Sequence, residues 1–307
     1  IAVKFALAVV YPNAGNLGGG GFMVYRSKSG EVTSLDFREK APAAAHKDMY
    51  LDKEGNPITD LSLYGQLAAG VPGAVAGMDE AFKKYGTLSW EVLIQPAIEL
   101  AEKGFAITAM QAREFNSYKE RFVKFNPNGA AIIKDGEWKE GDIFVQQELA
   151  ETLKRIASQG RDGFYKGQTA DYIVAEMKRG NGIMTHSDLE NYKAIWRKPI
   201  VGEYKGHKII SMPPPSSGGV ALLALLQSVE KYPLAQWGFQ SDSTVRAMVE
   251  AERRVYADRA THLGDPDFYR VPVEHLTSAA YNQSRMANVS LAKATDSETI
   301  KAGKFPG

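Results

Sequence analysis

Two short segments of the chain carry residue types that could support anion binding or nucleophilic catalysis. The first is Asn16-Leu17-Gly18-Gly19-Gly20-Gly21, where bare backbone amides could cradle a phosphate group. Its spacing fits neither GxGxxG nor GxxxxGK(S/T), because Met23 stands where the third glycine of the first motif would fall, and Gly21 replaces the lysine of the second. Close backbone packing, or unusual torsion angles before a strand, is the preferred interpretation of the four glycines.

The second segment is Pro213-Pro214-Pro215-Ser216-Ser217-Gly218-Gly219, which is similar to a nucleophile or oxyanion loop. No base can be assigned to it, and its local order is not that of the GxSxG elbow. A rigid turn with a serine N-cap explains the segment with fewer assumptions, and a catalytic serine is the less favoured alternative.

The histidines and a cluster of charged residues give no local signature of a metal site or catalytic site. No HExxH or other short ligand spacing connects the histidines, so we expect surface or capping roles and no bound metal. The charged cluster could flank an active site, but a solvated helix face with local ion pairs is the preferred interpretation. The histidines are His46, His186, His207, His262 and His275, and the cluster comprises Glu250, Glu252, Arg253, Arg254, Asp258 and Arg259.

Two β-hairpins and several helices are predicted to position these segments. Apolar and polar residues alternate on both sides of Ser29-Gly30, and the second strand of that hairpin delivers Asp36, Phe37 and Arg38. A second hairpin comprises residues 199–204 and 207–212, with its turn at Lys205-Gly206.

Helical spacing dominates the rest of the chain. Residues 73–104 predict two amphipathic helices broken near Tyr85-Gly86, and residues 146–158, 169–178 and 187–192 predict three more, the last with Ser187 as its N-cap. Residues 243–263 predict a long helix that directs four apolar residues toward a core and keeps four charged residues on its polar sides. The apolar set is Val245, Met248, Val249 and Val255, and the charged set is Glu250, Glu252, Arg253 and Arg254.

Composition limits the classes of function. A chain of 307 residues with 44% hydrophobic residues can bury a large core, and 37 Lys and Arg against 36 Asp and Glu leave no global field for nucleic acid or an anionic membrane. The absence of cysteine excludes thiolate chemistry and is compatible with an oxidising compartment. The apolar residues 5–10 are far too few to span a bilayer, and because the chain opens inside an apolar helix, we expect a trimmed N-terminus.

Five motifs are spread over nearly the whole chain: NAGNLGGGGFMVYR, LDFREKAP, AAGVPGAVAGM, MPPPSSGG and YADRATHLGDPDF. In this order they resemble the large subunit of γ-glutamyltransferases, particularly the bacterial type. Such a combination is far more specific than any one motif.

The resemblance implies an α/β fold, the four-layer αββα sandwich of N-terminal-nucleophile hydrolases, with residues 1–307 as the large subunit. We expect one compact unit that is completed by a small subunit cut from the same precursor, and an exposed C-terminal tail at residues 290–307 near the cleavage site. In this family the nucleophile is the threonine at the start of the small subunit, so no catalytic residue is expected in this chain, and no metal or cofactor. The implied substrates are glutathione or another γ-glutamyl compound, with an amino acid, a dipeptide or water as acceptor, in the periplasm or outside the cell.

Arg38 is the one residue to which the resemblance assigns a role in binding substrate. It stands in Asp36-Phe37-Arg38-Glu39, which is similar to the family segment whose arginine binds the α-carboxylate of the γ-glutamyl group. A guanidinium can hold a carboxylate through two parallel hydrogen bonds, whereas lysine offers only a point charge on a flexible stem. Without the resemblance, an ion pair of Arg38 with Asp36 or Glu39 at a strand end would be the default interpretation.

Two other functions remain open. Acylases that remove a glutaryl side chain from β-lactams share many of the same motifs, although a glutaryl group lacks the α-amino group of the γ-glutamyl group. A chain without its own nucleophile could also be a non-catalytic protein that binds a small molecule.

Overall fold

A computed structural model of the chain describes residues 1–14 and 16–305. The chain folds into two compact units, unit 1 with Ile1–Gly21 and Asp36–Ile195, and unit 2 with Phe22–Leu35 and Trp196–Gly307. The prediction of one compact unit concerns the chain completed by a small subunit, and it stays a prediction. Among the described residues, no helix combines the length and the apolar composition that crossing a membrane requires.

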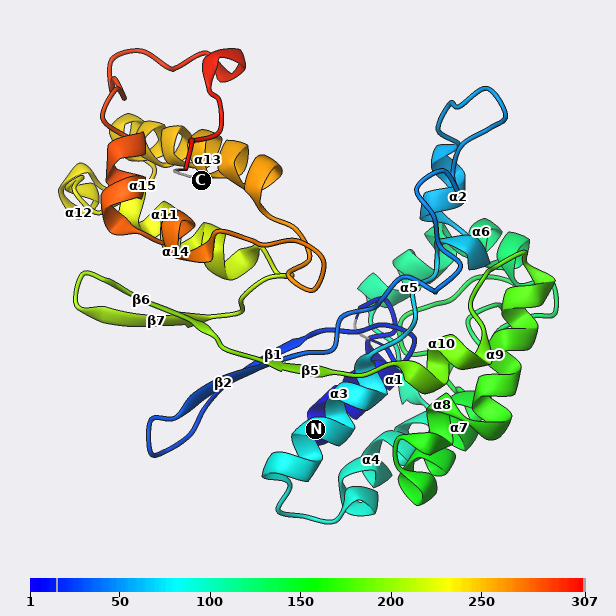
Figure 1. The fold of residues 1–307 in the computed structure, drawn as a ribbon. Coiled ribbons are helices and arrows are strands. Elements are labelled where there is room, and N and C mark those ends of the chain that lie inside the picture. Colours follow the sequence, from blue (N-terminus) through cyan, green and yellow to red (C-terminus); the bar gives the residue numbers. More distant parts are fainter. Residues whose placement is uncertain (15, 306–307) are drawn as a thin grey trace. The chain divides into compact units, whose positions relative to one another are not determined.

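Unit 1 is mainly helical (Figure 1). Its main helices are α1 (Ala2–Val10), α3 (Ala74–Tyr85), α4 (Trp90–Lys103), α5 (Ala109–Ser117), α6 (Lys119–Phe125), α7 (Gln147–Gln159) and α9 (Gly167–Arg179). The shorter elements are α2 (Thr59–Leu63), α8 (Asp162–Tyr165), α10 (His186–Asn191), the 3₁₀ helix Gln66–Ala68, and the paired strands β3 (Phe105–Ala106) and β4 (Ile143–Phe144). The predicted break between two amphipathic helices at Tyr85-Gly86 is confirmed, because α3 ends at Tyr85 and Gly86 caps it.

A single tryptophan connects three helices of the unit 1 core. Trp90 begins α4, and its indole N–H donates to the carbonyl oxygen of Ile156 in α7 at 2.8 Å. Its ring also meets the ring of Phe5 in α1 edge to face, with the centroids 5.5 Å apart. Since a buried indole needs a partner for its N–H, this bond fixes the spacing of α4 and α7 as well as satisfying the donor.

Unit 2 combines hairpins with helices. Strands β1 (Phe22–Arg26) and β2 (Val32–Asp36) form a sheet with β5 (Ile195–Arg197), and β6 (Ile200–Tyr204) pairs with β7 (His207–Ser211) in the register Ile200 to Ser211. Both predicted hairpins are confirmed, with positive φ at Gly30 in the first turn and at Lys205 and Gly206 in the second. The helices are α11 (Gly218–Val229), α12 (Leu234–Trp237), α13 (Asp242–His262), α14 (Val273–Leu276), α15 (Ala279–Arg285) and the 3₁₀ helix Ser297–Thr299.

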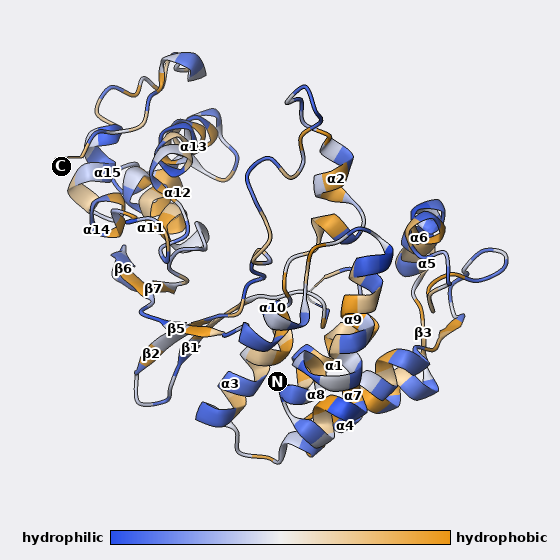
Figure 2. Ribbon diagram, turned by 45° about the vertical axis from the view of Figure 1, so that its right-hand side comes forward, coloured by the Kyte–Doolittle hydropathy of each residue, from blue (hydrophilic) through white to orange (hydrophobic). Residues whose placement is uncertain are grey.

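The long helix α13 buries charged residues that were predicted to be solvated. Val245 and Met248 are 44% and 46% exposed, whereas Glu250 and Arg254 are only 1% and 3% exposed. Figure 2 shows both hydrophobic and hydrophilic residues along α13. The predicted burial is wrong for Val245, Met248, Val249, Glu250 and Arg254. It is confirmed for Val255, which is 6% exposed, and for Glu252, which is exposed. Small residues such as Ala247 and Ala251 let α13 approach α11 closely, and the buried charges are paired.

Two predicted helix caps also differ from the structure. Helix α10 begins with Thr185, whose hydroxyl accepts from the backbone N–H of Asp188 in a capping box, so Ser187 lies inside the first turn. Ser217 precedes α11, but its hydroxyl accepts from Arg259 at 2.9 Å and makes no cap bond. Thr185, and not Ser187, caps α10 because the Asp188 carboxylate three residues later accepts a hydrogen bond from the Thr185 backbone N–H.

The segment after Ser290 lies against α13 within unit 2. The backbone N–H of Thr295 donates to Glu250 at 2.8 Å, and that of Gly303 donates to Asp258 at 2.7 Å. Most side chains of this segment are exposed, and both of these hydrogen bonds come from its backbone. Its expected position near a cleavage site stays a prediction.

Candidate functional site

Arg38 lies in a short extended segment of unit 1 that is hydrogen bonded along both sides. On one side, Phe37 and Gly21 exchange backbone hydrogen bonds of 3.0 and 3.2 Å. On the other, Lys40 and Val71 do the same at 3.2 and 2.7 Å. Because its neighbours are paired in this way, the backbone at Arg38 has little freedom to move.

Glycines make this arrangement possible by close packing. A Cβ atom at Gly20 would overlap the carbonyl oxygen of Phe37, and one at Gly77 in α3 would overlap the buried Phe37 ring. Gly73 leaves no room either, since a Cβ there would overlap both the Phe37 carbonyl oxygen and the Tyr192 hydroxyl. The predicted packing role of the glycine segment is therefore confirmed.

The phosphate-loop alternative finds no support in the hydrogen bonds of that segment. The N–H groups of Gly19 and Gly21 donate to the carbonyl oxygens of Asn16 and Phe37 at 3.2 Å each. The Gly19 carbonyl oxygen accepts from Gly73 and Ala74 at 2.9 and 3.0 Å, which ties the segment to the start of α3. Amides used in this way are not available to an anion.

Two buried tyrosines, Tyr192 and Tyr165, support the Arg38 backbone. The Tyr192 hydroxyl donates to the Arg38 carbonyl oxygen at 2.7 Å, and its ring stacks on that of Tyr165 with centroids 5.9 Å apart. The Tyr165 hydroxyl donates in turn to the Pro72 carbonyl oxygen at 2.8 Å. Burial raises the pKa of both phenols above the ordinary value, so both remain protonated donors.

The Arg38 side chain is exposed, and its guanidinium forms no ion pair or hydrogen bond with any of the described residues. Asp36 accepts the backbone N–H of Arg38 at 3.1 Å, so the expected alternative of a side-chain pair with Asp36 or Glu39 is not formed. Nearby, burial lowers the pKa of the Lys4 ammonium while the charge of Glu39 acts in the opposite direction. An exposed guanidinium on a fixed backbone can bind a carboxylate without first breaking an ion pair.

The other candidates do not form a site with Arg38. The Ser216 hydroxyl accepts from the Gly218 N–H at 3.2 Å and Ser217 bonds to Arg259, so neither serine has a base among its partners in the described chain. His186 pairs with Asp171 and His262 bonds to the Gly303 carbonyl oxygen. Within residues 1–14 and 16–305, no three His, Asp or Glu side chains are grouped as metal ligands.

Sequence reasoning found Arg38 but missed the residues that hold it in place. Gly73 and Gly77 lie within AAGVPGAVAGM, so a signal for them existed in the glycine spacing. Tyr192 had no local signal, because its partner Arg38 lies more than a hundred residues earlier in the chain.

Fold and site together define an α/β protein with an exposed, backbone-anchored arginine suited to a carboxylate ligand. The sequence profile of the γ-glutamyltranspeptidase family matches residues 1–305, and the chain belongs to that family.

Relatives and solved structures agree with this assignment. The chain is 46% identical over 307 residues to the glutathione hydrolase proenzyme of Escherichia coli, covering 99% of this chain and 53% of the relative. It is 34% identical to the acylase ACY 1 proenzyme of a Pseudomonas species, covering 96% of this chain and 54% of that protein. The chain therefore spans about half the length of the curated relatives it matches.

The fold is similar to that of crystal structures of the same family. The γ-glutamyltranspeptidase of Helicobacter pylori matches with a TM-score of 0.96 and 48% identity, covering 98% of this chain and 87% of that one. The enzyme from Pseudomonas nitroreducens, complexed with L-DON, matches with a TM-score of 0.92 and 41% identity, covering 98% and 89%. These matches confirm the predicted α/β fold class and the assignment of this chain as the large-subunit part.

Proposed function

We propose that this chain is the substrate-anchoring part of a γ-glutamyltransferase and glutathione hydrolase, and that Arg38 binds the α-carboxylate of the γ-glutamyl substrate. The observation that carries the proposal is the exposed Arg38 guanidinium, which has no ion-pair partner in the described chain while its backbone is held by Tyr192. Two parallel N–H to oxygen bonds would fix the substrate's position and its orientation.

The proposed reaction is acyl transfer with the nucleophile supplied by a second chain. A threonine hydroxyl there attacks the γ-carbonyl carbon of glutathione while its own α-amine accepts the proton. The amide bond breaks as that proton passes to the leaving nitrogen, which releases cysteinylglycine. Water then releases glutamate from the acyl-enzyme, or an amino acid or dipeptide amine takes the γ-glutamyl group. Each step needs donors for the developing oxyanion, so the contribution of this chain is to position the substrate.

The proposed partner is a small subunit cut from the same precursor. The share of the relatives' length that this chain matches supports it, as does the name proenzyme that those relatives bear. Denaturing mass spectrometry of the complete protein should detect a second, smaller chain that begins with threonine, whereas a lone chain of this mass would favour a non-catalytic binding protein. Location in the periplasm or outside the cell is part of the proposal, and the absence of cysteine is compatible with it.

Arg38 substitutions test the proposal directly. Arg38→Lys should lower kcat/KM for a γ-glutamyl anilide by about one to two decades, because the bidentate contact is lost. This corresponds to a loss of about 1.5–3 kcal/mol of transition-state stabilisation. Arg38→Ala should cost more, since the substrate carboxylate is left without a partner. Arg26→Lys is the matched control, because Arg26 is an exposed arginine at the end of β1. Unchanged kcat/KM in Arg38→Lys would rule out the assignment.

A glutaryl acylase is the second candidate, and the similarity to acylase ACY 1 favours keeping it in the test. Hydrolysis of a γ-glutamyl amide and of the matching glutaryl amide should be compared with the same enzyme. Both amides carry the carboxylate that Arg38 would bind and differ only in the α-amino group. The proposal requires faster hydrolysis of the γ-glutamyl compound, and such a preference would reflect recognition of that amino group. Faster hydrolysis of the glutaryl amide would indicate that the protein is a glutaryl acylase.

A further inference from the structure

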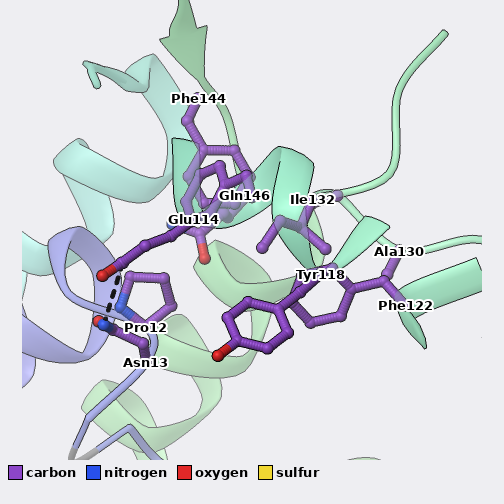
Figure 3. Close-up of a pocket in the computed structure, with 11 residues that line it drawn as sticks. Pro12, Asn13, Glu114, Tyr118, Phe122, Ala130, Ile132, Phe144 and Gln146 are labelled. Atoms are coloured by element: carbon purple, nitrogen blue, oxygen red, sulfur yellow. Dashed lines mark hydrogen bonds between the residues drawn. The ribbon is translucent and has the colours of Figure 1, made fainter. Parts of the chain in front are cut away.

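Unit 1 contains a cavity of about 620 Å³ that the proposed function does not use. Its walls come from the end of α1, from α5 and α6, from strand β4 and from residues 130–132 (Figure 3). This volume lies within the range of roughly 300–1,000 Å³ that is usual for sites that bind small molecules.

One wall of the cavity is aromatic and rigid. Phe115 and Phe144 are buried and meet edge to face, with ring centroids 5.3 Å apart. Trp138 packs edge-on against both, so neither ring can turn without displacing another. Phe122 and Ile132 extend this apolar surface toward solvent. Such a wall fits the flat body of an aromatic ligand.

Two acceptors that line the cavity, Gln146 and Glu114, have little or no hydrogen bonding from the described residues, although the donors Asn13 and Tyr118 line it as well. Gln146 is only 7% exposed and its amide nitrogen donates to the Val9 carbonyl oxygen at 2.9 Å, but its amide oxygen accepts no hydrogen bond from the described residues. Glu114 accepts one long bond of 3.3 Å, from the Asn13 amide, and within the described chain no lysine, arginine or histidine pairs with it. Figure 3 shows both side chains at the same cavity as the Tyr118 ring.

These groups favour a ligand that donates hydrogen bonds and carries positive charge. The Gln146 amide oxygen and the Glu114 carboxylate both line the cavity, and an ammonium group there can donate to either of them. The guanidinium of Arg121 lies over the rings of Tyr64 and Tyr118, at 4.7 and 5.6 Å from their centroids. Arg121 does not line the cavity, so the acceptors within it remain available.

We infer that this cavity binds a small primary amine with an aromatic body, its ammonium group held by Glu114 and Gln146 and its ring against Phe115, Phe122 and Phe144. The contacts divide the ligand into two recognisable parts. The carboxylate rejects an anionic analogue of the same shape, and the aromatic wall rejects an amine without a ring.

The test is a direct binding measurement on the complete protein, with 2-phenylethylammonium as the probe and calorimetry or ligand-observed NMR as the readout. Glu114→Gln should raise the Kd by about tenfold or more, because a charge-assisted hydrogen bond becomes a neutral one. Glu120→Gln is the matched control, since Glu120 is an exposed carboxylate at the start of α6 that does not line the cavity. 3-Phenylpropionate, which has a similar body and the opposite charge, should not bind.

Two further variants locate the binding of the probe within the molecule. Phe122→Ala should also weaken binding, because it removes part of the apolar wall. Arg38→Lys should leave the Kd unchanged, so the cavity and the proposed role of Arg38 can fail independently. The inference is overturned if the complete protein does not bind the probe, which would mean that another segment fills the cavity, or if Glu114→Gln and Glu120→Gln bind it equally well. Binding that depends on Arg38 would also overturn it.

Discussion

Arg38 and Arg254 are arginines in very different surroundings. The Arg38 side chain is exposed and unpaired within the described chain, and only the backbone of this residue is fixed. The Arg254 side chain is buried and donates to Glu250 at 2.6 Å, to the Glu250 carbonyl oxygen at 3.0 Å and to Asn288 at 3.2 Å. One guanidinium is available to a ligand, whereas the other is buried and hydrogen bonded to its own chain.

A binding arginine differs from a structural one in the part of the residue that the fold holds in place, the main chain or the charged side chain. At Arg38 the fold fixes the main chain through Phe37, Lys40 and Tyr192 and leaves the charge free. At Arg254 the fold removes the charge from water and must therefore supply a counter-charge, Glu250. Perturbing Arg254 should consequently change stability, and perturbing Arg38 should change activity.

The largest effect is expected from Glu250→Gln, which leaves Arg254 buried without its counter-charge. The free energy of unfolding should fall by about 3–5 kcal/mol, as is usual when one partner of a buried ion pair is removed. Urea denaturation of the complete protein measures the loss. Glu252→Gln, an exposed carboxylate on the same helix, should change stability by less than about 0.5 kcal/mol. Equal effects of the two substitutions would remove the distinction between the two arginines.

The pH dependence of stability gives a second measure of the same pair. Burial tends to raise the pKa of the Glu250 carboxyl, but hydrogen bonds from Thr295 and Arg254 outweigh it and lower the pKa from 4.5 to about 2. A carboxyl with a lowered folded-state pKa stabilises the protein above pH 4.5 and loses that contribution as the pH falls through 2. The stability difference between the wild type and Glu250→Gln should therefore shrink by on the order of 3 kcal/mol between pH 5 and pH 2. A difference that stays constant over this range would contradict the lowered pKa.

Gly73→Ala tests the packing that holds the Arg38 backbone. The new Cβ would overlap the Phe37 carbonyl oxygen and the Tyr192 hydroxyl, so we expect a stability loss of about 1–3 kcal/mol together with reduced kcat/KM. Gly218→Ala is a suitable control, because its Cβ would make only an ordinary contact with the Ser216 hydroxyl. Thermal unfolding and steady-state kinetics provide the readouts. Wild-type values for Gly73→Ala in both would show that the close approach is not needed.

The smallest effect is expected from Tyr192→Phe, which removes one hydrogen bond to the Arg38 carbonyl oxygen. The cost should be about 1 kcal/mol in stability, with KM raised more than kcat is lowered, because substrate positioning depends on this backbone. Tyr11→Phe is the control at an exposed tyrosine. A fall in kcat alone would assign Tyr192 a role other than positioning Arg38.

Local patterns predicted the elements of this chain well. The two hairpins, the break at Tyr85-Gly86 and the long helix after residue 242 all follow from short-range spacing and turn residues. The same reasoning misplaced most, but not all, of the residues assigned to the two faces of α13, because burial of Glu250 and Arg254 depends on Asn288 and Thr295, which lie far along the chain. Periodicity records which residues are apolar, and it carries no information about distant partners that can neutralise a charge.

The sequence by itself determined the family, the position of Arg38 shortly after a hairpin strand, and the glycines that let backbones approach. Only the tertiary structure decided that the Arg38 guanidinium has no ion-pair partner among the described residues, that Tyr192 holds its backbone, and that Gln146 and Glu114 face one cavity. The physical reason is that whether a side chain is available to a ligand depends on every group that folding brings near it, including groups more than a hundred residues away.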